Sequence, residues 1–316
     1  GYTDHCSSGA MTQGHLLAAA SRIWADVGKE LESGSETDLA DAADGVIVSP
    51  EEVKKVAKWM QHVLTKFGAS AAVADGPEDK ALKPIAEELI KVFTVAIGTL
   101  LSLKRGACPS LVAELRSVGG GLAEAMDALG AAIGTPEMAL NSGKVLDRNR
   151  QFERVSTQNR AAIRRRVLGA YKQIQDASRE LNEALQEKPE DEAELDDDDF
   201  DDDFGCFDES LEPEERALVE AIAKVAADVS DVLKATSQAC VPKEGSEGRA
   251  ASVAELEAAR VACEAAVNAV DGLAAHSLGG VDPPALALVL KECIAASQGL
   301  LVTEDAAWAG AAASLA

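Results

Sequence analysis

Residues 49–67 read SPEEVKKVAKWMQHVLTKF, and this stretch combines a helix start with a helical stripe of apolar side chains. Ser49 is a favourable N-cap, Pro50 suits the first helical position, and Glu52 stands where a capping box places an acid. Apolar residues then recur at spacings of three and four, which is the period of one helix face. They are Val53, Val56, Ala57, Met60, Val63, Leu64 and Phe67. The stretch therefore predicts an amphipathic helix that packs against other helices.

The same spacing recurs along most of the chain and predicts about ten helices. Besides 49–67, they cover approximately residues 16–34, 79–104, 109–129, 136–152, 157–186, 210–240, 252–276, 282–301 and 303–316. The 47% hydrophobic content is mostly Ala, Leu and Val, and aromatics are only 3%, which favours helix over strand. Long helices joined by short loops predict an all-α fold of antiparallel up-and-down bundles, like those of vinculin and talin.

Three consecutive glycines, Gly119 to Gly121, interrupt the predicted helix 109–129. Each weakens a helix by about 1 kcal/mol relative to Ala, so we expect a bend here or the close approach of another helix. A phosphate-binding loop is not expected, because no strand precedes the glycines and no GK[ST] follows them. The tryptophans Trp24, Trp59 and Trp308 fall on predicted helices and are interpreted as packing residues.

The stretch LDDDDFDDDFGCFDE at 195–209 places seven aspartates in eight positions. An EF-hand loop that began at Asp199 would need Gly at its sixth position and Glu at its twelfth, but these are Phe204 and Ser210. A loop that began at Asp201 fails as well, with Cys206 at its sixth position. Adjacent aspartates also repel one another, so they are poorly suited to form a fixed catalytic pair. The sequence predicts neither a metal site nor a catalytic site here.

Runs of like charge are usually disordered, so the acidic stretch is predicted to join two folded parts. The predicted domains are an N-terminal helical bundle at 13–188, an acidic linker at 189–212 and a C-terminal helical bundle at 213–316, with residues 1–12 left out of the fold prediction. Three aromatics in the acidic stretch, Phe200, Phe204 and Phe207, leave a second interpretation open. Acidic residues interspersed with aromatics suit an arm that docks on a basic, partly apolar groove.

A basic region precedes the acidic stretch in this otherwise acidic chain. Nine basic residues lie from Lys144 to Lys172, against two acids, Asp147 and Glu153. The region is interpreted as a solvated helix face, as a short nuclear-localisation-like cluster, or as the surface on which the acidic arm docks. The candidate docking residues are Arg160, Arg164, Arg165, Arg166, Phe200, Phe204 and Phe207.

Charge and motif content narrow the function classes. The net charge is −24, which disfavours nucleic acid and anionic membranes as partners and favours proteins that present Lys and Arg. No apolar run reaches the ~18–20 residues of a membrane span, and no secretory signal is expected at the N-terminus. The six cysteines form no CxxC and are expected to be reduced. No catalytic, nucleotide-binding or metal-binding motif occurs, so we expect no catalysis, metal or cofactor.

Three stretches together resemble the Grap2 and cyclin-D-interacting protein family, also called cyclin-D-binding proteins. They are LKRGACPSLVAELRSVGGGLAEAMDAL at 103–129, QNRAAIRRRVLGAYKQIQDASREL at 158–181, and the acidic run followed by EPEERALVEAIAKV at 212–225. The second is similar to the N-(K/R)-A-A helix start of that family. The family's V-W-x-A-C before this helix is absent, since residues 145–155 read VLDRNRQFERV.

The resemblance implies an all-helical protein of nucleus and cytoplasm that binds D-type cyclins, adaptor proteins and helix-loop-helix transcription factors. It implies restraint of cell-cycle progression without catalysis. The alternative, from the same fold class, is a cytoskeletal adaptor of the talin or vinculin type. A carboxylate di-iron enzyme would need Glu-x-x-His pairs, which the sequence lacks.

Overall fold

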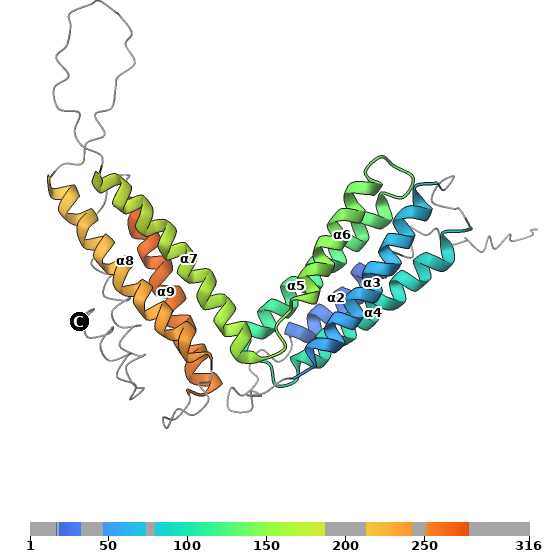
Figure 1. Cartoon of the computed structure of the whole chain (residues 1–316), viewed down its shortest axis with the longest axis horizontal. Helices are drawn as coiled ribbons and strands as arrows, with labels where there is room; N and C mark the ends of the chain where they lie inside the picture. Colours follow the sequence, from blue (N-terminus) through green and yellow to red (C-terminus); the bar gives the residue numbers. More distant parts are fainter. Residues whose placement is uncertain are drawn as a thin grey trace, which may run out of the picture. The chain divides into compact units, whose positions relative to one another are not determined.

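The computed structural model describes residues 17, 19–32, 47–73, 80–186, 213–241 and 251–277. All regular secondary structure in these ranges is α-helix, so the predicted all-α fold is confirmed (Figure 1). The helices are α2 (Ala19–Glu32), α3 (Pro50–Ala71), α4 (Lys83–Lys104), α5 (Pro109–Ala131), α6 (Met138–Glu153), α7 (Asn159–Gln186), α8 (Pro213–Ala239) and α9 (Val253–Ser277). The helices predicted at 282–301 and 303–316 lie outside the described residues, as do Trp308 and the predicted linker.

The helix starts follow the local signals in the sequence. The Ser49 hydroxyl accepts a hydrogen bond from the Glu51 amide at 3.2 Å and donates one to the Glu51 carboxylate at 2.7 Å. The Glu51 carboxylate, one residue before the Glu52 of the predicted capping box, thus bonds to the capping hydroxyl. Pro109 opens α5 as predicted. The helix predicted from 79 begins only at Lys83, with Pro84 in its first turn.

The chain divides into two compact units, Gly1–Ala162 (unit 1) and Ile163–Ala316 (unit 2). The division falls inside α7, whereas the sequence analysis assigned this helix to an N-terminal bundle that ends at 188. From Ile163 onward, the apolar stripe of α7 is buried within unit 2. Periodicity predicts such a stripe but does not predict which helices cover it, so the domain boundaries at 188 and 213 stay predictions beside this division.

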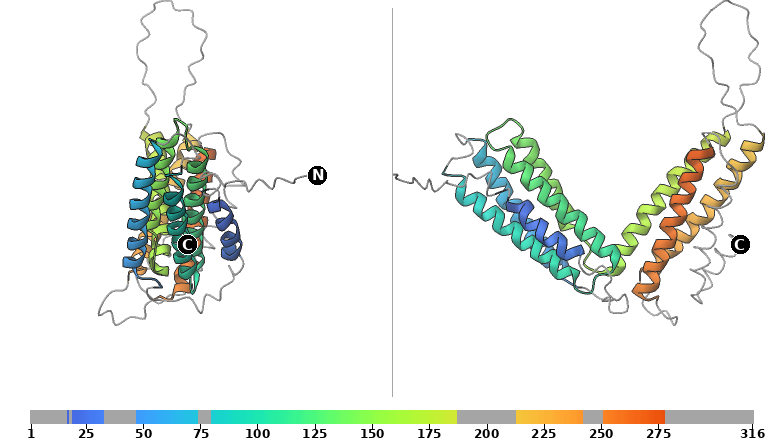
Figure 2. Two further views of the ribbon diagram at one scale, coloured as in Figure 1. Left: turned by 90° about the vertical axis from the view of Figure 1, so that its right-hand side faces the viewer. Right: turned by 180° about the vertical axis from the view of Figure 1, so that it is seen from behind.

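Unit 1 is a bundle of α3, α4, α5 and α6 to which α2 is added. The helix α3 packs against α4 and α6, and α5 packs against α6 and α4. The helix α2 packs against both α5 and α4 (Figure 2). Phe67, Phe93 and Phe152 are fully buried in the core. These rings come from α3, α4 and α6, so the apolar faces of different helices meet in one core.

Unit 2 contains the larger part of α7 beside α8 and α9 (Figure 1). Arg216 near the start of α8 donates to the carbonyl of Leu185 near the end of α7, at 2.6 Å. Arg164 near the start of α7 donates to Ser237 near the end of α8, at 3.4 Å. The two helices are therefore antiparallel, as expected for an up-and-down arrangement.

Candidate protein-interaction surfaces

Asn159, at the start of α7, holds the turn between α4 and α5. Its side-chain oxygen accepts from the Cys108 amide at 2.7 Å, and its side-chain nitrogen donates to the Gly106 carbonyl at 2.8 Å. Gly106 has a positive φ of 75°, which suits glycine, and Asn159 is 1% exposed. Two stretches that carry the family resemblance, RGACP and QNRAA, thus meet at one buried amide. Asn159 serves the fold and is not an exposed contact residue.

The glycine triplet on α5 receives side chains from two neighbouring helices. A Cβ added at Gly119 would lie 2.2 Å from the Trp24 ring of α2, and one at Gly120 would lie 3.3 Å from it. A Cβ at Gly121 would lie 3.1 Å from the guanidinium carbon of Arg148 on α6. The predicted close approach of another helix is confirmed, and so is the interpretation of Trp24 as a packing residue.

Two basic side chains of the bundle cap the C-terminal end of α2. Lys104 at the end of α4 donates to the carbonyl of Glu30, and Arg116 of α5 donates to the carbonyl of Leu31 at 2.7 Å. The last carbonyls of a helix are available to partners outside it, and here two side chains of the bundle bond to them. Lys104 and Arg116 could not be predicted from the sequence, because a capping contact between helices far apart in sequence leaves no local pattern.

The predicted basic docking residues lie in different environments. Arg160 is buried in unit 1, whereas Arg164, Arg165 and Arg166 are exposed on the part of α7 that belongs to unit 2. Arg164 hydrogen-bonds to Ser237, and Arg166 forms an ion pair with Glu264 of α9 at 2.8 Å. Two arginines of the triplet therefore have partners within their own unit. Phe200, Phe204 and Phe207 lie outside the described residues, so docking of the acidic arm stays a prediction.

A charged network links α7 to α9 around Glu264. This carboxylate accepts from Arg166 through both of its oxygens, at 2.8 and 3.3 Å, and also pairs with Arg260. Arg260 in turn pairs at 3.3 Å with Glu257, whose side chain is only 3% exposed. The ion pair with Glu264 raises the pKa of Arg166. The sequence showed the arginine triplet but not these acids, which lie about a hundred residues further along.

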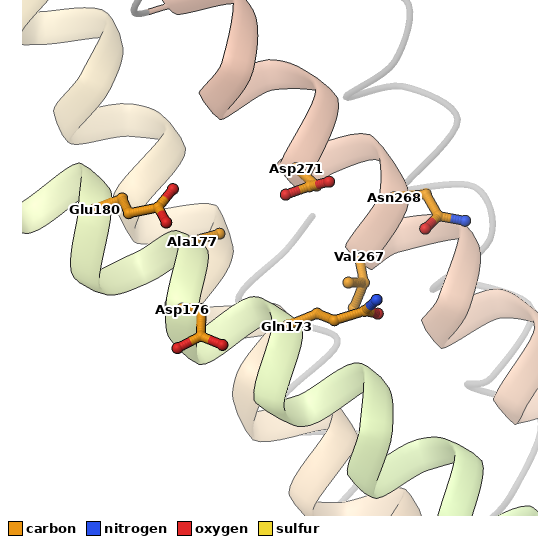
Figure 3. A pocket seen from close by; sticks show the side chains of 7 residues that line it. All are labelled: Gln173, Asp176, Ala177, Glu180, Val267, Asn268 and Asp271. Carbon is orange, nitrogen blue, oxygen red and sulfur yellow. The ribbon is translucent and has the colours of Figure 1, made fainter. Parts of the chain in front are cut away.

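A hollow of about 180 Å³ lies between α7 and α9 in unit 2 (Figure 3). Its lining is dominated by carboxylates and side-chain amides. The lining residues are Gln173, Asp176, Ala177, Glu180, Val267, Asn268 and Asp271. Within the described part of the chain, no group of three or more His, Cys, Asp or Glu side chains could hold a metal ion.

The described cysteines Cys108, Cys240 and Cys263 are buried, and no disulfide joins them to one another. Burial raises the pKa of Cys263 to about 11. Its sulfur lies 3.6 Å from the Thr236 hydroxyl oxygen. Such a thiol is a packing group with little thiolate character at neutral pH.

Residues 52–187 match the family model described as Grap2 and cyclin-D-interacting, N-terminal. This segment is similar to the N-terminal domain of the Grap2 and cyclin-D-interacting family. The resemblance seen in the sequence is thereby confirmed. The matched segment contains α4, α5 and α6, nearly all of α3, and all of α7. The helices α2, α8 and α9 lie outside the matched segment.

The chain matches none of the curated proteins and none of the solved structures with which it was compared. Among the described helices, none combines the length and the apolar character needed to cross a membrane.

Proposed function

We propose that this protein is a non-catalytic interaction regulator that binds D-type cyclins and helix-loop-helix factors and so restrains cell-cycle progression. The match of residues 52–187 to the Grap2 and cyclin-D-interacting family carries the proposal. By the same resemblance, we place the protein in nucleus and cytoplasm and include adaptor proteins among its partners. The net charge of −24 supports partners with basic surfaces, since complementary charge speeds association.

The environment of the matched motifs narrows where a partner can bind. Asn159 is buried and bonded to the α4–α5 turn, and Arg160 is buried as well. These residues maintain the bundle and offer little surface to a partner. A partner of the matched domain must instead contact the outer faces of its helices, or a groove that another segment can vacate.

Binding of the purified full-length chain to immobilised cyclins tests the proposal. A D-type cyclin is expected to retain the chain, and an A-type cyclin, as the control, is not. A second chain without residues 190–210 measures what the acidic stretch adds. A helix-loop-helix factor and filamentous actin complete the set, because actin is the partner that the talin-like alternative predicts. Retention by actin and by neither cyclin nor helix-loop-helix factor would replace the proposal with that alternative.

A further inference from the structure

The helix α2 is held by unit 1 much as a bound peptide helix is held by a groove. Ala20, Trp24, Val27 and Leu31 follow the spacing of four, three and four that helix-in-groove ligands use. Ala20 and Leu31 are fully buried, and the Trp24 ring lies against Gly119 and Gly120. The helix packs against α4 and α5, and the surface that these two helices present to it is called the α4–α5 groove. Figure 2 shows α2 along these two helices. The occupied groove thus has the geometry of a helix-binding site.

The floor of this groove is shaped for a flat aromatic ring. At Gly119 even a methyl group would overlap the Trp24 ring, since the added Cβ would lie 2.2 Å from it. The absence of a side chain here costs α5 intrinsic helix stability, about 1 kcal/mol for each glycine. Glycine at 119 and 120 therefore serves the ring that lies on it, and the groove selects a helix with a large aromatic at this position.

One end of the groove recognises a helix C-terminus by its backbone. Lys104 and Arg116 bond to the carbonyls of Glu30 and Leu31, which every helix presents in its last turn. Their positive charges also favour the negative end of a helix dipole. Any amphipathic helix of suitable length and direction satisfies the same two donors.

The helix α2 buries fewer side chains than the other helices of unit 1. Of its described residues, only Ala20 and Leu31 are fully buried, whereas Ile23, Trp24 and Val27 remain half-buried. The helix has 14 residues, a length at which an isolated helix is marginal in water. It also lies outside the family match, which begins at 52 and includes both walls of the groove. The matched domain supplies the site, and α2 comes from outside it.

We propose that the α4–α5 groove is a helix-binding site which α2 occupies in cis, and from which an amphipathic helix of a partner protein displaces it. The displacing helix carries a large aromatic at the position of Trp24 and ends against Lys104 and Arg116. The inference rests on the proposed function only in taking the ligand to be a protein. Occupation by α2 weakens partner binding. The apparent Kd of the partner is its intrinsic Kd divided by the fraction of molecules in which the groove is empty.

Anisotropy of a fluorescein-labelled peptide of residues 16–33 tests this site on the full-length chain. Trp24→Ala in the chain weakens α2 and empties the groove, so this variant should bind the peptide roughly ten-fold more tightly than the unchanged chain. Adding Gly119→Ala should abolish the gain, because the new methyl group meets the peptide's tryptophan. Gly98→Ala on α4 is the matched control, since its added Cβ meets nothing within 4 Å. Both changes replace glycine by alanine and so favour the helix to a similar degree. Loss of peptide binding with Gly119→Ala alone therefore shows that the peptide binds in the groove.

Equal peptide affinity in the Trp24→Ala and unchanged chains would overturn the inference, as would equal behaviour of Gly119→Ala and Gly98→Ala. Circular dichroism shows whether Trp24→Ala unfolds other helices besides α2. If it does, hydrogen exchange of the unchanged chain tests whether α2 can leave the groove. Amides of α2 must then exchange roughly a hundred-fold faster than those of α4 and α5. Similar protection of all three helices contradicts an exchangeable α2. Cyclin binding is measured on the same preparations. It tests the proposed function separately from the groove, because the chain can bind a cyclin without binding the peptide, and the reverse.

Discussion

At the scale of single residues, Asn159 is expected to be a large contributor to the stability of unit 1. Changing Asn159→Ala leaves the Cys108 amide and the Gly106 carbonyl without this side chain. We expect a loss of roughly 2–4 kcal/mol, because an unsatisfied buried polar group costs about 1–3 kcal/mol. Urea unfolding followed by tryptophan fluorescence measures it, since Trp24 and Trp59 both lie in unit 1.

The matched control is Thr65→Ala on the exposed face of α3, which also lies in unit 1. Thr65 also donates to a carbonyl, that of Gln61 at 2.9 Å, but this bond is exposed. Its loss should change stability by no more than about 0.5 kcal/mol. Equal unfolding midpoints for the two variants would show that the Asn159 contacts add nothing specific.

Cys263 makes the stability of unit 2 dependent on pH in the alkaline range. Its pKa is raised from 9.0 to about 11, chiefly because burial disfavours the thiolate. Below pH 9 both folded and unfolded states keep the proton. Between pH 9 and about 11 the unfolded thiol ionises first, so stability falls as pH rises, by at most about 2–3 kcal/mol for this group.

Comparison with Cys263→Ala isolates this effect from the lysines and tyrosines that titrate nearby in pH. The urea midpoint of unit 2, followed by circular dichroism, should fall more steeply with pH in the unchanged chain than in the variant. Parallel pH profiles would mean that the thiol ionises as easily in the folded state as in the unfolded one.

Some of the contacts made by single residues could be predicted from the sequence. The cost of three helical glycines predicted a close approach, and Trp24 at Gly119 confirms it. The identity of the approaching helix, and the capping of α2 by Lys104 and Arg116, could not be predicted. Such contacts join residues about 75 to 85 positions apart, and each side chain alone resembles an ordinary surface cation.

At the scale of helices, Glu264 is expected to be the residue that couples α7 to α9. Glu264→Gln removes the charge that faces both Arg166 and Arg260. Arg260 and Glu257 are nearly buried. Without the charge of Glu264, the positive charges of Arg166 and Arg260 are no longer balanced where water solvates them poorly. We expect unit 2 to lose about 1–2 kcal/mol, measured as a shift in its urea midpoint by circular dichroism.

Glu220→Gln on α8 provides the matched control for this change. Glu220 pairs with Arg216 at 3.8 Å, and both side chains are about half exposed. Exposed pairs of this kind contribute about 0–1 kcal/mol. If Glu220→Gln destabilises unit 2 as much as Glu264→Gln does, the network around Arg260 holds α7 no better than a surface pair.

Helix starts were more predictable than helix neighbours. Ser49 and Pro109 act through their own next few residues, so local sequence was sufficient for α3 and α5. The membership of α7 was not predictable in the same way. Its stripe of Ile163, Val167, Ile174 and Leu181 is apolar in either bundle, and only tertiary structure shows which unit buries it.

At the scale of the whole molecule, the division inside α7 predicts how the chain behaves when it is cut. A break within residues 189–212 leaves α7 on the N-terminal fragment, although its stripe is buried in unit 2. Val167, Ile174 and Leu181 are all fully buried. Burial of each such side chain contributes about 1.5–3 kcal/mol. We therefore expect the two fragments to remain associated after cleavage.

A specific protease site inserted between Leu195 and Phe204 makes this test practicable, with size-exclusion chromatography as the measurement. The cut chain should elute as one particle at micromolar concentration. Ile174→Glu places a charge in the buried stripe and should separate the fragments once the chain is cut. Leu168→Glu, at a position on α7 that is already 40% exposed, should leave them together. Separation of the unchanged fragments would instead restore the boundary at 188, with α7 stable as part of the N-terminal bundle alone.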